Sequence, residues 1–377
     1  MASQETQKQK LLQLVLASFA EAEKTCTIPT ILFFQDKLPG TSITFQRLMV
    51  ALSACAVGIS IAIFCYLIIG HQLYWTSTRE QKHIIKIIGT LIVFGLLSFF
   101  SVVFLRLAPY LIPIAQFYEG FGMVSLFMLY IIYLTPEDAT REQFFDNLER
   151  RWINGKKKTD RGSLRWFRIV CLMVFQILPA RTGTLIASEV LRSVTCPITA
   201  TRQYGNLGIE VISGVNTALT VAGVIVFERR MHAELQPHHG VLKLVAFKSL
   251  VGLQATQAII FSTLASKRIW SPSKYVSYMD FLEGVPNFMV CWEVFFCSLL
   301  FLKAYSFAPY KAKVQQGAVP QRGSSKAFVA LINPLDIWWG YRYLFTGHLR
   351  LHKESDSNLP TKKHDNAAQL EDGLTRP

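Results

Sequence analysis

The sequence predicts an all-α membrane protein built around a bundle of seven transmembrane helices. Charged residues make up only 17% of the 377 residues, whereas hydrophobic residues make up 51% and fall into long blocks. A soluble chain usually carries about 25% charged residues, and a helix needs about 20 mostly apolar residues to cross a bilayer. The chain then divides into an N-terminal segment (1–47), a seven-helix domain (48–303), a cytosolic or interfacial helical segment (304–346) and a disordered tail (347–377).

The first predicted element is a short amphipathic helix at residues 11–20, with lysines before it and glutamates after it. This stretch is too short to span a membrane or to form the core of a signal peptide. Among the seven blocks that follow, the fourth has the weakest pattern, because Gln176, Pro179 and Arg181 interrupt it. We expect the seven spans at 48–70, 84–106, 111–134, 167–187, 205–227, 241–264 and 281–303.

The chain after the last block is predicted to stay at or outside the membrane surface. Residues 327–346 are too polar to span, but they carry tryptophans and tyrosines, which favour the headgroup region of a bilayer. We therefore expect an interfacial helix there. Residues 347–377 are polar and mixed in charge, which is typical of a disordered tail.

The distribution of lysine and arginine predicts the orientation. The loops at 71–83, 135–166 and 228–240 hold 12 of these residues, and the three loops on the opposite side hold 5. The richer side of a membrane protein is normally cytosolic, so the N-terminus is expected outside the cytosol and the C-terminus inside. The net charge of +14 then reflects orientation and contact with anionic membrane lipids, and no nucleic-acid partner is expected. The pattern leaves open a plasma membrane or a vacuolar or other endomembrane.

Four ionisable residues lie inside the predicted spans: Glu119, Arg181, Lys248 and Glu293. At about 1.5 Å per residue, Glu119 lies roughly 12 Å and Arg181 roughly 9 Å below the outer surface. Lys248 lies roughly 10 Å and Glu293 roughly 15 Å from the inner surface. These depths allow two ion pairs, Glu119 with Arg181 and Lys248 with Glu293.

Two interpretations of these charges stay open. Ionisable residues are rare in spans and mark solute or ion pathways, so the four can form a polar site within the membrane. Alternatively, the pairs only hold helices together, or the Lys248 ammonium extends to the inner surface. Uncharged polar residues support a site, although hydrogen bonds between helices would explain each of them; they are Asn216, Gln254, Asn287, Gln116, Gln176 and Gln257.

Two of the seven cysteines, Cys26 and Cys196, fall outside the apolar blocks and on the predicted outer side. An oxidising compartment permits a disulfide between them, but spacing alone leaves two free thiols equally open. The sequence contains no CxxC pair and none of the motifs that mark nucleotide-binding sites, nucleophilic hydrolases or zinc proteases. We therefore expect no enzyme activity, no metal and no cofactor.

Several segments resemble the organic solute transporter alpha-subunit family in its fungal and plant form. Their order and spacing match over roughly residues 45–345. The matching segments are FYEGF at 117–121, NTAL at 216–219, the region from Lys243 to Leu264 with Gln254, NFMVCWE at 287–293, AYSF at 304–307 and NPLD at 333–336.

The resemblance implies seven spans and ATP-independent movement of amphipathic organic anions, sterol-like or lipid-like solutes. Lys248 or Arg181 would then contact the anion, and Glu119 and Glu293 would hold the cation in place. It also implies a homo-oligomer or a small single-span partner. An alternative is a membrane organiser or receptor-like scaffold that recruits cytosolic partners through residues 304–377, where Tyr341 and Leu344 fit a short docking pattern.

Overall fold

The computed structural model describes residues 13, 30–33, 35–148, 163–196, 199–266 and 273–320. Within these ranges the chain is helical apart from loops and one isolated β-bridge between Lys37 and Thr44. The long helices are α2 (Phe45–Leu73), α3 (Thr78–Val103), α4 (Ala108–Leu134), α6 (Ser163–Phe175), α7 (Ile177–Val194), α8 (Ala200–Arg230), α10 (Gly240–Ser266) and α11 (Val285–Ala304). The short ones are η1 (Thr30–Phe33), α5 (Asp138–Asp146), α9 (His232–Leu235), η2 (Gln236–His238), η3 (Asp280–Gly284) and α12 (Ala308–Gln315).

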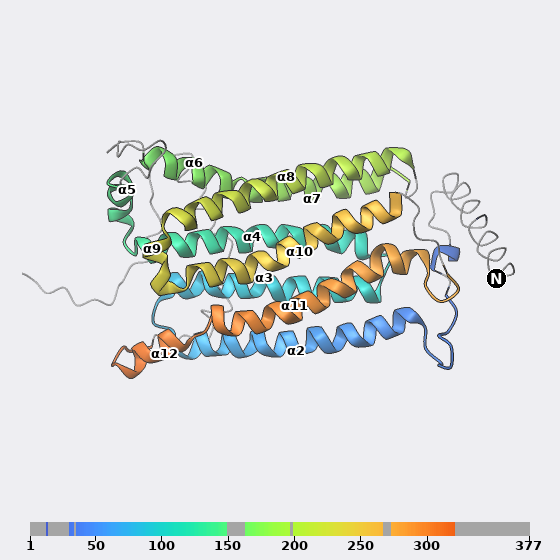
Figure 1. Ribbon diagram of the computed structural model, residues 1–377, viewed down its shortest axis with the longest axis horizontal. Helices are drawn as coiled ribbons and strands as arrows, with labels where there is room; N and C mark the ends of the chain where they lie inside the picture. The colour runs from blue at the N-terminus through green and yellow to red at the C-terminus, as the bar shows by residue number, and fades with distance from the viewer. Residues whose placement is uncertain are drawn as a thin grey trace, which may run out of the picture.

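The long helices run along the longest axis of the molecule and form one bundle (Figure 1). Helices α5, α9 and α12 lie at one end of it, which we call the α12 end, and η1 lies at the opposite end. Helices α3 and α4 form the centre of the bundle: 67% and 72% of the residues in their most apolar stretches are buried, against only 22% in α8. The exposed face of α8 is apolar, as a lipid-facing surface should be.

Six helical stretches of the described residues are long and apolar enough to cross a membrane. The prediction of a multi-pass α-helical membrane protein is therefore confirmed. The six are Phe45–Leu73, Thr78–Val103, Ala108–Leu134, Leu164–Val194, Ala200–Arg230 and Asp280–Gln315. The seventh predicted span, 241–264, coincides with the 27-residue α10, which runs beside the others but is not among the six. The count of seven stays a prediction.

The fourth predicted span consists of two helices. Helices α6 and α7 meet at Gln176, three residues before Pro179. Proline has no amide hydrogen to bond to the carbonyl four residues earlier, and its ring crowds that carbonyl. The kink therefore falls one residue after Phe175, the residue to whose carbonyl an amide hydrogen at position 179 would donate. The interruption that weakened the sequence pattern is thus the point at which the span bends.

Two short helices lie at the α12 end: α5, which the sequence did not predict, and α12, which falls within the helical segment expected at 304–346. Phe307, just before α12, packs directly on Gly70 of α2 and stacks on the Tyr74 ring at 5.8 Å. Any side chain at Gly70 would occupy the space of that ring. Tyr310 of α12 then donates a hydrogen bond of 2.8 Å to Glu80. The chain after the last span is therefore folded back against α2 and α3.

Most of the other predictions for the chain ends lie outside the described residues. This applies to all but one residue of the amphipathic helix at 11–20, and to the interfacial helix at 327–346 and the tail at 347–377.

Candidate functional site

A buried ion pair joins α4 and α7 in the half of the bundle away from α12. The Arg181 Nη2 atom lies 2.7 Å from Glu119 Oε2, and each side chain is 6% exposed. This is the pair that the estimated depths allowed. Burying two charges costs several kcal/mol, and good geometry with further hydrogen bonds is needed to offset that cost.

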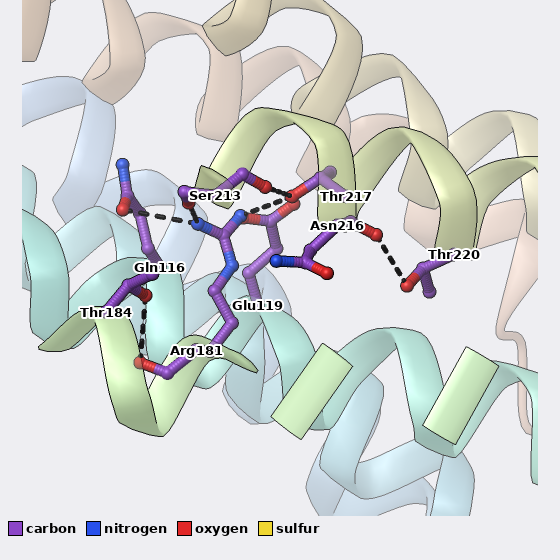
Figure 2. A network of polar contacts seen from close by, with 8 residues as sticks. All are labelled: Gln116, Glu119, Arg181, Thr184, Ser213, Asn216, Thr217 and Thr220. Carbon is purple, nitrogen blue, oxygen red and sulfur yellow. Dashed lines mark hydrogen bonds and ion pairs between the residues drawn. The ribbon is translucent and has the colours of Figure 1, made fainter. Parts of the chain in front are cut away.

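Helix α8 supplies part of the further hydrogen bonds. Arg181 Nη2 also donates to Thr217 Oγ1 at 2.8 Å, and Nη1 donates to the Ser213 hydroxyl. Ser213 and Thr217 are four residues apart, so they lie on the same face of α8. Nη1 donates in addition to Gln116 Oε1 at 3.3 Å, one turn from Glu119 on α4. Figure 2 shows the guanidinium of α7 held between acceptors from α4 and α8.

One donor of this guanidinium stays unused. The Arg181 Nε atom is buried and has no hydrogen-bond partner within the described part of the chain. Arginine never loses its charge in proteins and binds carboxylates and other oxyanions through adjacent N–H groups. The site can therefore accept an anionic oxygen beside Glu119, or exchange Glu119 for it.

A second set of polar contacts extends the network from the kink along α8 toward Arg230. Gln176, at the kink, donates to the Asn216 carbonyl at 3.0 Å and to Thr220 Oγ1 at 3.1 Å. Thr220 is fully buried, and its hydroxyl lies within hydrogen-bond distance of two carbonyls, Asn216 at 2.9 Å in its own helix and Met173 at 3.2 Å in α6. The Gln176 side chain and the Met173 carbonyl thus connect the kink to α8.

The other predicted ion pair is absent, and that prediction was wrong. Glu293 of α11 accepts a hydrogen bond from Gln257 Nε2, and Lys248 lies on an exposed face of α10. Residues 248 and 257 are nine positions apart, which at about 100° per residue places them roughly 180° apart around the helix. The residues that do face α11 are offset from Lys248: Ser249 lies 3.6 Å from Cys297, one turn past Glu293. Lys248 is therefore on the wrong side of α10, whatever its depth.

Comparisons with known proteins identify the family. Residues 49–310 match the family model described as "Organic solute transporter Ostalpha". The chain belongs to this family. The match covers well over half of the chain and includes both the Arg181 network and Glu293, and it confirms the resemblance found in the sequence.

A curated relative agrees with the Ostalpha assignment. It is a transmembrane protein 184 homolog from Dictyostelium discoideum, 24% identical over 263 residues. The aligned part makes up 67% of this chain and 51% of the relative, so the chain spans about half the length of that protein. No solved structure matches the chain.

The remaining residues of the predicted site are scattered. Asn287, in an Ostalpha-like segment, is buried and donates to the Glu283 carbonyl at 2.8 Å, which holds the junction of η3 and α11. The Asn216 side chain donates to the Ile212 carbonyl at 2.8 Å within its own helix, so only its carbonyl joins the network. The backbone of Gln254 is part of α10, but its side chain is not among those that the structure describes. Neither Asn287 nor Asn216 contacts Arg181 through its side chain.

Sequence reasoning missed the three hydroxyl residues of α8, Ser213, Thr217 and Thr220. Each is common in membrane helices and carries little signal alone. Their spacing of four and three residues places them on one face of a helix, and that regularity was the available sign.

Cys196 follows α7 and is disulfide-bonded. Its predicted partner, Cys26, lies outside the described residues, so the pairing stays a prediction. The free cysteines of the described chain are Cys55, Cys65, Cys171, Cys291 and Cys297.

Proposed function

We propose that this Ostalpha-family protein moves amphipathic organic anions, sterol-like or lipid-like solutes across a membrane down their gradient, without ATP and without chemical change to the solute. In this proposal α10 is the seventh span, the N-terminus is outside the cytosol, and the α12 end is cytosolic. The membrane is a plasma membrane or a vacuolar or other endomembrane. Lipids, and a homo-oligomer or small single-span partner, are the expected neighbours, and the exposed apolar face of α8 suits either.

The observation that carries the proposal is the Arg181 site. A cation with five possible hydrogen bonds is 5% exposed inside an apolar bundle, and four different side chains accept from it. Such residues are costly in a membrane and mark solute pathways. An anionic headgroup of the solute would replace Glu119 on Arg181, and the apolar part of the solute would lie against the surrounding helices.

Glu119 has a defined role in this scheme. Without solute it neutralises Arg181, because an unpaired guanidinium would be costly in the bundle. When the anion arrives, Thr217 and Ser213 still hold the guanidinium in place. The site thus exchanges one anion for another on a fixed cation, which keeps binding weak enough for release.

The test separates this role from simple stabilisation. Arg181→Gln and Glu119→Gln each leave one buried charge unpaired and should cost about 3–5 kcal/mol of stability. The double variant has no unpaired charge and should recover most of it. Reconstituted into liposomes, it should fold but lose at least tenfold in uptake of a dansyl-labelled alkyl sulfonate, a permanent amphipathic anion.

A matched control is available on the same helix. Arg192 and Glu189 form a partly exposed ion pair of 2.8 Å near the end of α7. Neutralising both should leave uptake unchanged. If the Arg181→Gln/Glu119→Gln variant transports normally, Arg181 is a structural residue and the proposed site is wrong.

A further inference from the structure

The start of α6 and the end of α8 form an exposed cationic surface at the α12 end (Figure 1). It is made of Arg165 and Arg168 of α6 and Arg229 of α8, which are all exposed and which we call the arginine patch. Within the described chain, no carboxylate forms an ion pair with any of the three. The acidic neighbour on α8, Glu228, is buried and contacts His232 at 2.9 Å instead. The charge of the patch is therefore open to an anionic partner.

The two helices that carry the patch pack against each other at this level. The Trp166 ring lies parallel to the Phe227 ring at 6.0 Å, and the Arg230 guanidinium lies 4.1 Å from the centre of the Trp166 ring. Arg165 and Arg229 immediately precede Trp166 and Arg230 in the chain, so they flank the seam between α6 and α8. The arginine patch is thus one surface, and a tryptophan lies in its seam, as is common at the headgroup level of a membrane.

The exposed faces of α6 and α8 lie on the same side of the helix pair. Phe127 of α4 packs on Phe175 of α6 at 6.0 Å and on Phe227 of α8 at 5.0 Å. Helix α4 therefore lies behind both helices, and their exposed faces point away from the centre of the bundle. In a multi-pass membrane protein this outer surface is the one that meets lipid.

Apolar side chains continue these faces from the arginine patch toward the middle of the bundle. On α6, Ile169 and Leu172 are exposed, and each lies four residues after one of the two patch arginines of that helix. On α8, Val226 and Ala222 are exposed and lie three and seven residues before its patch arginine. Residues at these spacings share one face of a helix. A ligand that fits both parts of the surface has an anionic head and an apolar tail.

We propose that the arginine patch binds the headgroup of an anionic phospholipid, whose acyl chains lie along the exposed apolar faces of α6 and α8. Arginine binds phosphate through adjacent N–H groups, more specifically than lysine does. In the proposed orientation the α12 end is cytosolic, and anionic phospholipids are typical of the cytosolic leaflet. The apolar continuation favours a lipid over a soluble phosphate compound or an acidic protein, which would contact the arginines alone. The site lies at the opposite end of the bundle from Arg181 and does not depend on the proposed transport.

Lipid titration followed by native mass spectrometry tests the inference. Delipidated wild-type protein in detergent should retain dioleoylphosphatidylserine at concentrations about tenfold or more below those needed for dioleoylphosphatidylcholine. Arg165→Gln with Arg229→Gln removes two charges of the patch and should weaken retention of phosphatidylserine by about tenfold or more. The matched control, Lys311→Gln with Lys313→Gln, removes two exposed charges of α12 at the same end of the bundle and should retain the lipid as wild type does.

Each other outcome overturns a defined part of the proposal. Equal weakening by the two double variants means general attraction between charges and removes the site, as does equal retention of the two lipids. Glycerophosphoserine is the same headgroup without acyl chains; if it binds as tightly as the lipid, the ligand is a soluble phosphate compound and the lipid site is wrong.

A second measurement needs no substitution. A phosphatidylserine that carries a photoreactive diazirine in one acyl chain is added to wild-type protein, and the labelled peptides are identified by mass spectrometry. Labelling within 165–172 or 219–229 supports the site, because these segments carry the arginines and the apolar faces. Labelling confined to other helices overturns it. The substituted side chains are exposed, so both double variants should also keep the wild-type Tm in detergent.

Discussion

Gly122 of α4 offers a test of whether α10 is packed inside the bundle. An added methyl group at this position would lie 2.6 Å from the tip of the Phe247 ring and 2.8 Å from Thr90 Oγ1. Ordinary contacts are about 3.5–4.0 Å, so the ring of α10 would have to move by roughly 1 Å. Phe247 is 2% exposed and its ring is rigid. We expect Gly122→Ala to cost about 1–3 kcal/mol, the usual penalty for overpacking.

A double-mutant cycle isolates that contact. Phe247→Leu shortens the opposing side chain and should cost on the order of 1–2 kcal/mol, less than truncation to alanine. Combined with Gly122→Ala it makes room for the methyl group, so the two changes should partly cancel. Thermal unfolding in detergent, followed by loss of monodisperse protein, gives the four Tm values needed.

The control lies on α10 itself. Nothing is within 4 Å of a methyl group placed at Gly252, so Gly252→Ala should be neutral or stabilising by about 0.5–1 kcal/mol, because alanine favours helix over glycine. If Gly122→Ala is as harmless as Gly252→Ala, or if its effect simply adds to that of Phe247→Leu, then α10 does not pack on α4 at this point and its role as a seventh span loses its support.

Two further outcomes are expected. Loss of hydration lowers the pKa of His238, and Glu80 offsets part of that shift. The unfolded chain therefore binds more protons than the folded one, and stability should fall as the pH drops below about 6.5. The variant His238→Phe preserves the ring stack on Tyr133, at 4.2 Å in the wild type, and should weaken this fall in Tm; an unchanged pH profile would contradict the assignment. A Cys26–Cys196 disulfide should lower the intact mass of the protein by two hydrogens, and reductant should restore them. The variant Cys26→Ser should leave a free thiol at Cys196 that reacts with maleimide. A maleimide-reactive Cys196 in the unreduced wild type would exclude the bond.

The spans were predictable because hydropathy depends on the sequence within each helix. Long apolar blocks located six of the expected helices, and the turn between α3 and α4 falls at 104–107, beside the tight turn expected at 107–110. The kink at Gln176 was visible only as a weak pattern. Pro179 explains the kink, because a proline inside a helix removes one hydrogen bond and its ring crowds the carbonyl four residues earlier. Helix α12 falls within the helical segment expected at 304–346, but its bounds were not predicted, because eight residues show little periodicity. Contacts of Phe307 and Tyr310 with α2 and α3 fix its position.

The outcomes for the two predicted intramembrane ion pairs show what depth alone can predict. Counting residues gives the height of a side chain along the membrane normal, and it placed Glu119 and Arg181 at similar heights correctly. It says nothing about rotation around the helix axis, and rotation decided the other case. Gln257, not Lys248, faces Glu293 because the two α10 residues lie on opposite sides of the helix. A helical-wheel comparison would have shown that Lys248 and Gln257 cannot both face α11. Only the packing of the neighbouring helices decides which of the two does.

The two carboxylates of the predicted site differ in what holds them. Glu119 lies 2.7 Å from the Arg181 guanidinium, so removal of either partner leaves the other buried without its counterpart. Glu293 is only partly buried and accepts a hydrogen bond from the Gln257 amide. Replacing a buried ion pair by apolar residues of similar volume is often neutral or stabilising, so stability alone does not explain why a bundle would keep Arg181 with Glu119. The proposed exchange of Glu119 for a solute anion on a fixed cation does explain it. Neutralising Arg181 together with Glu119 should therefore abolish binding of the amphipathic anion while the bundle stays folded.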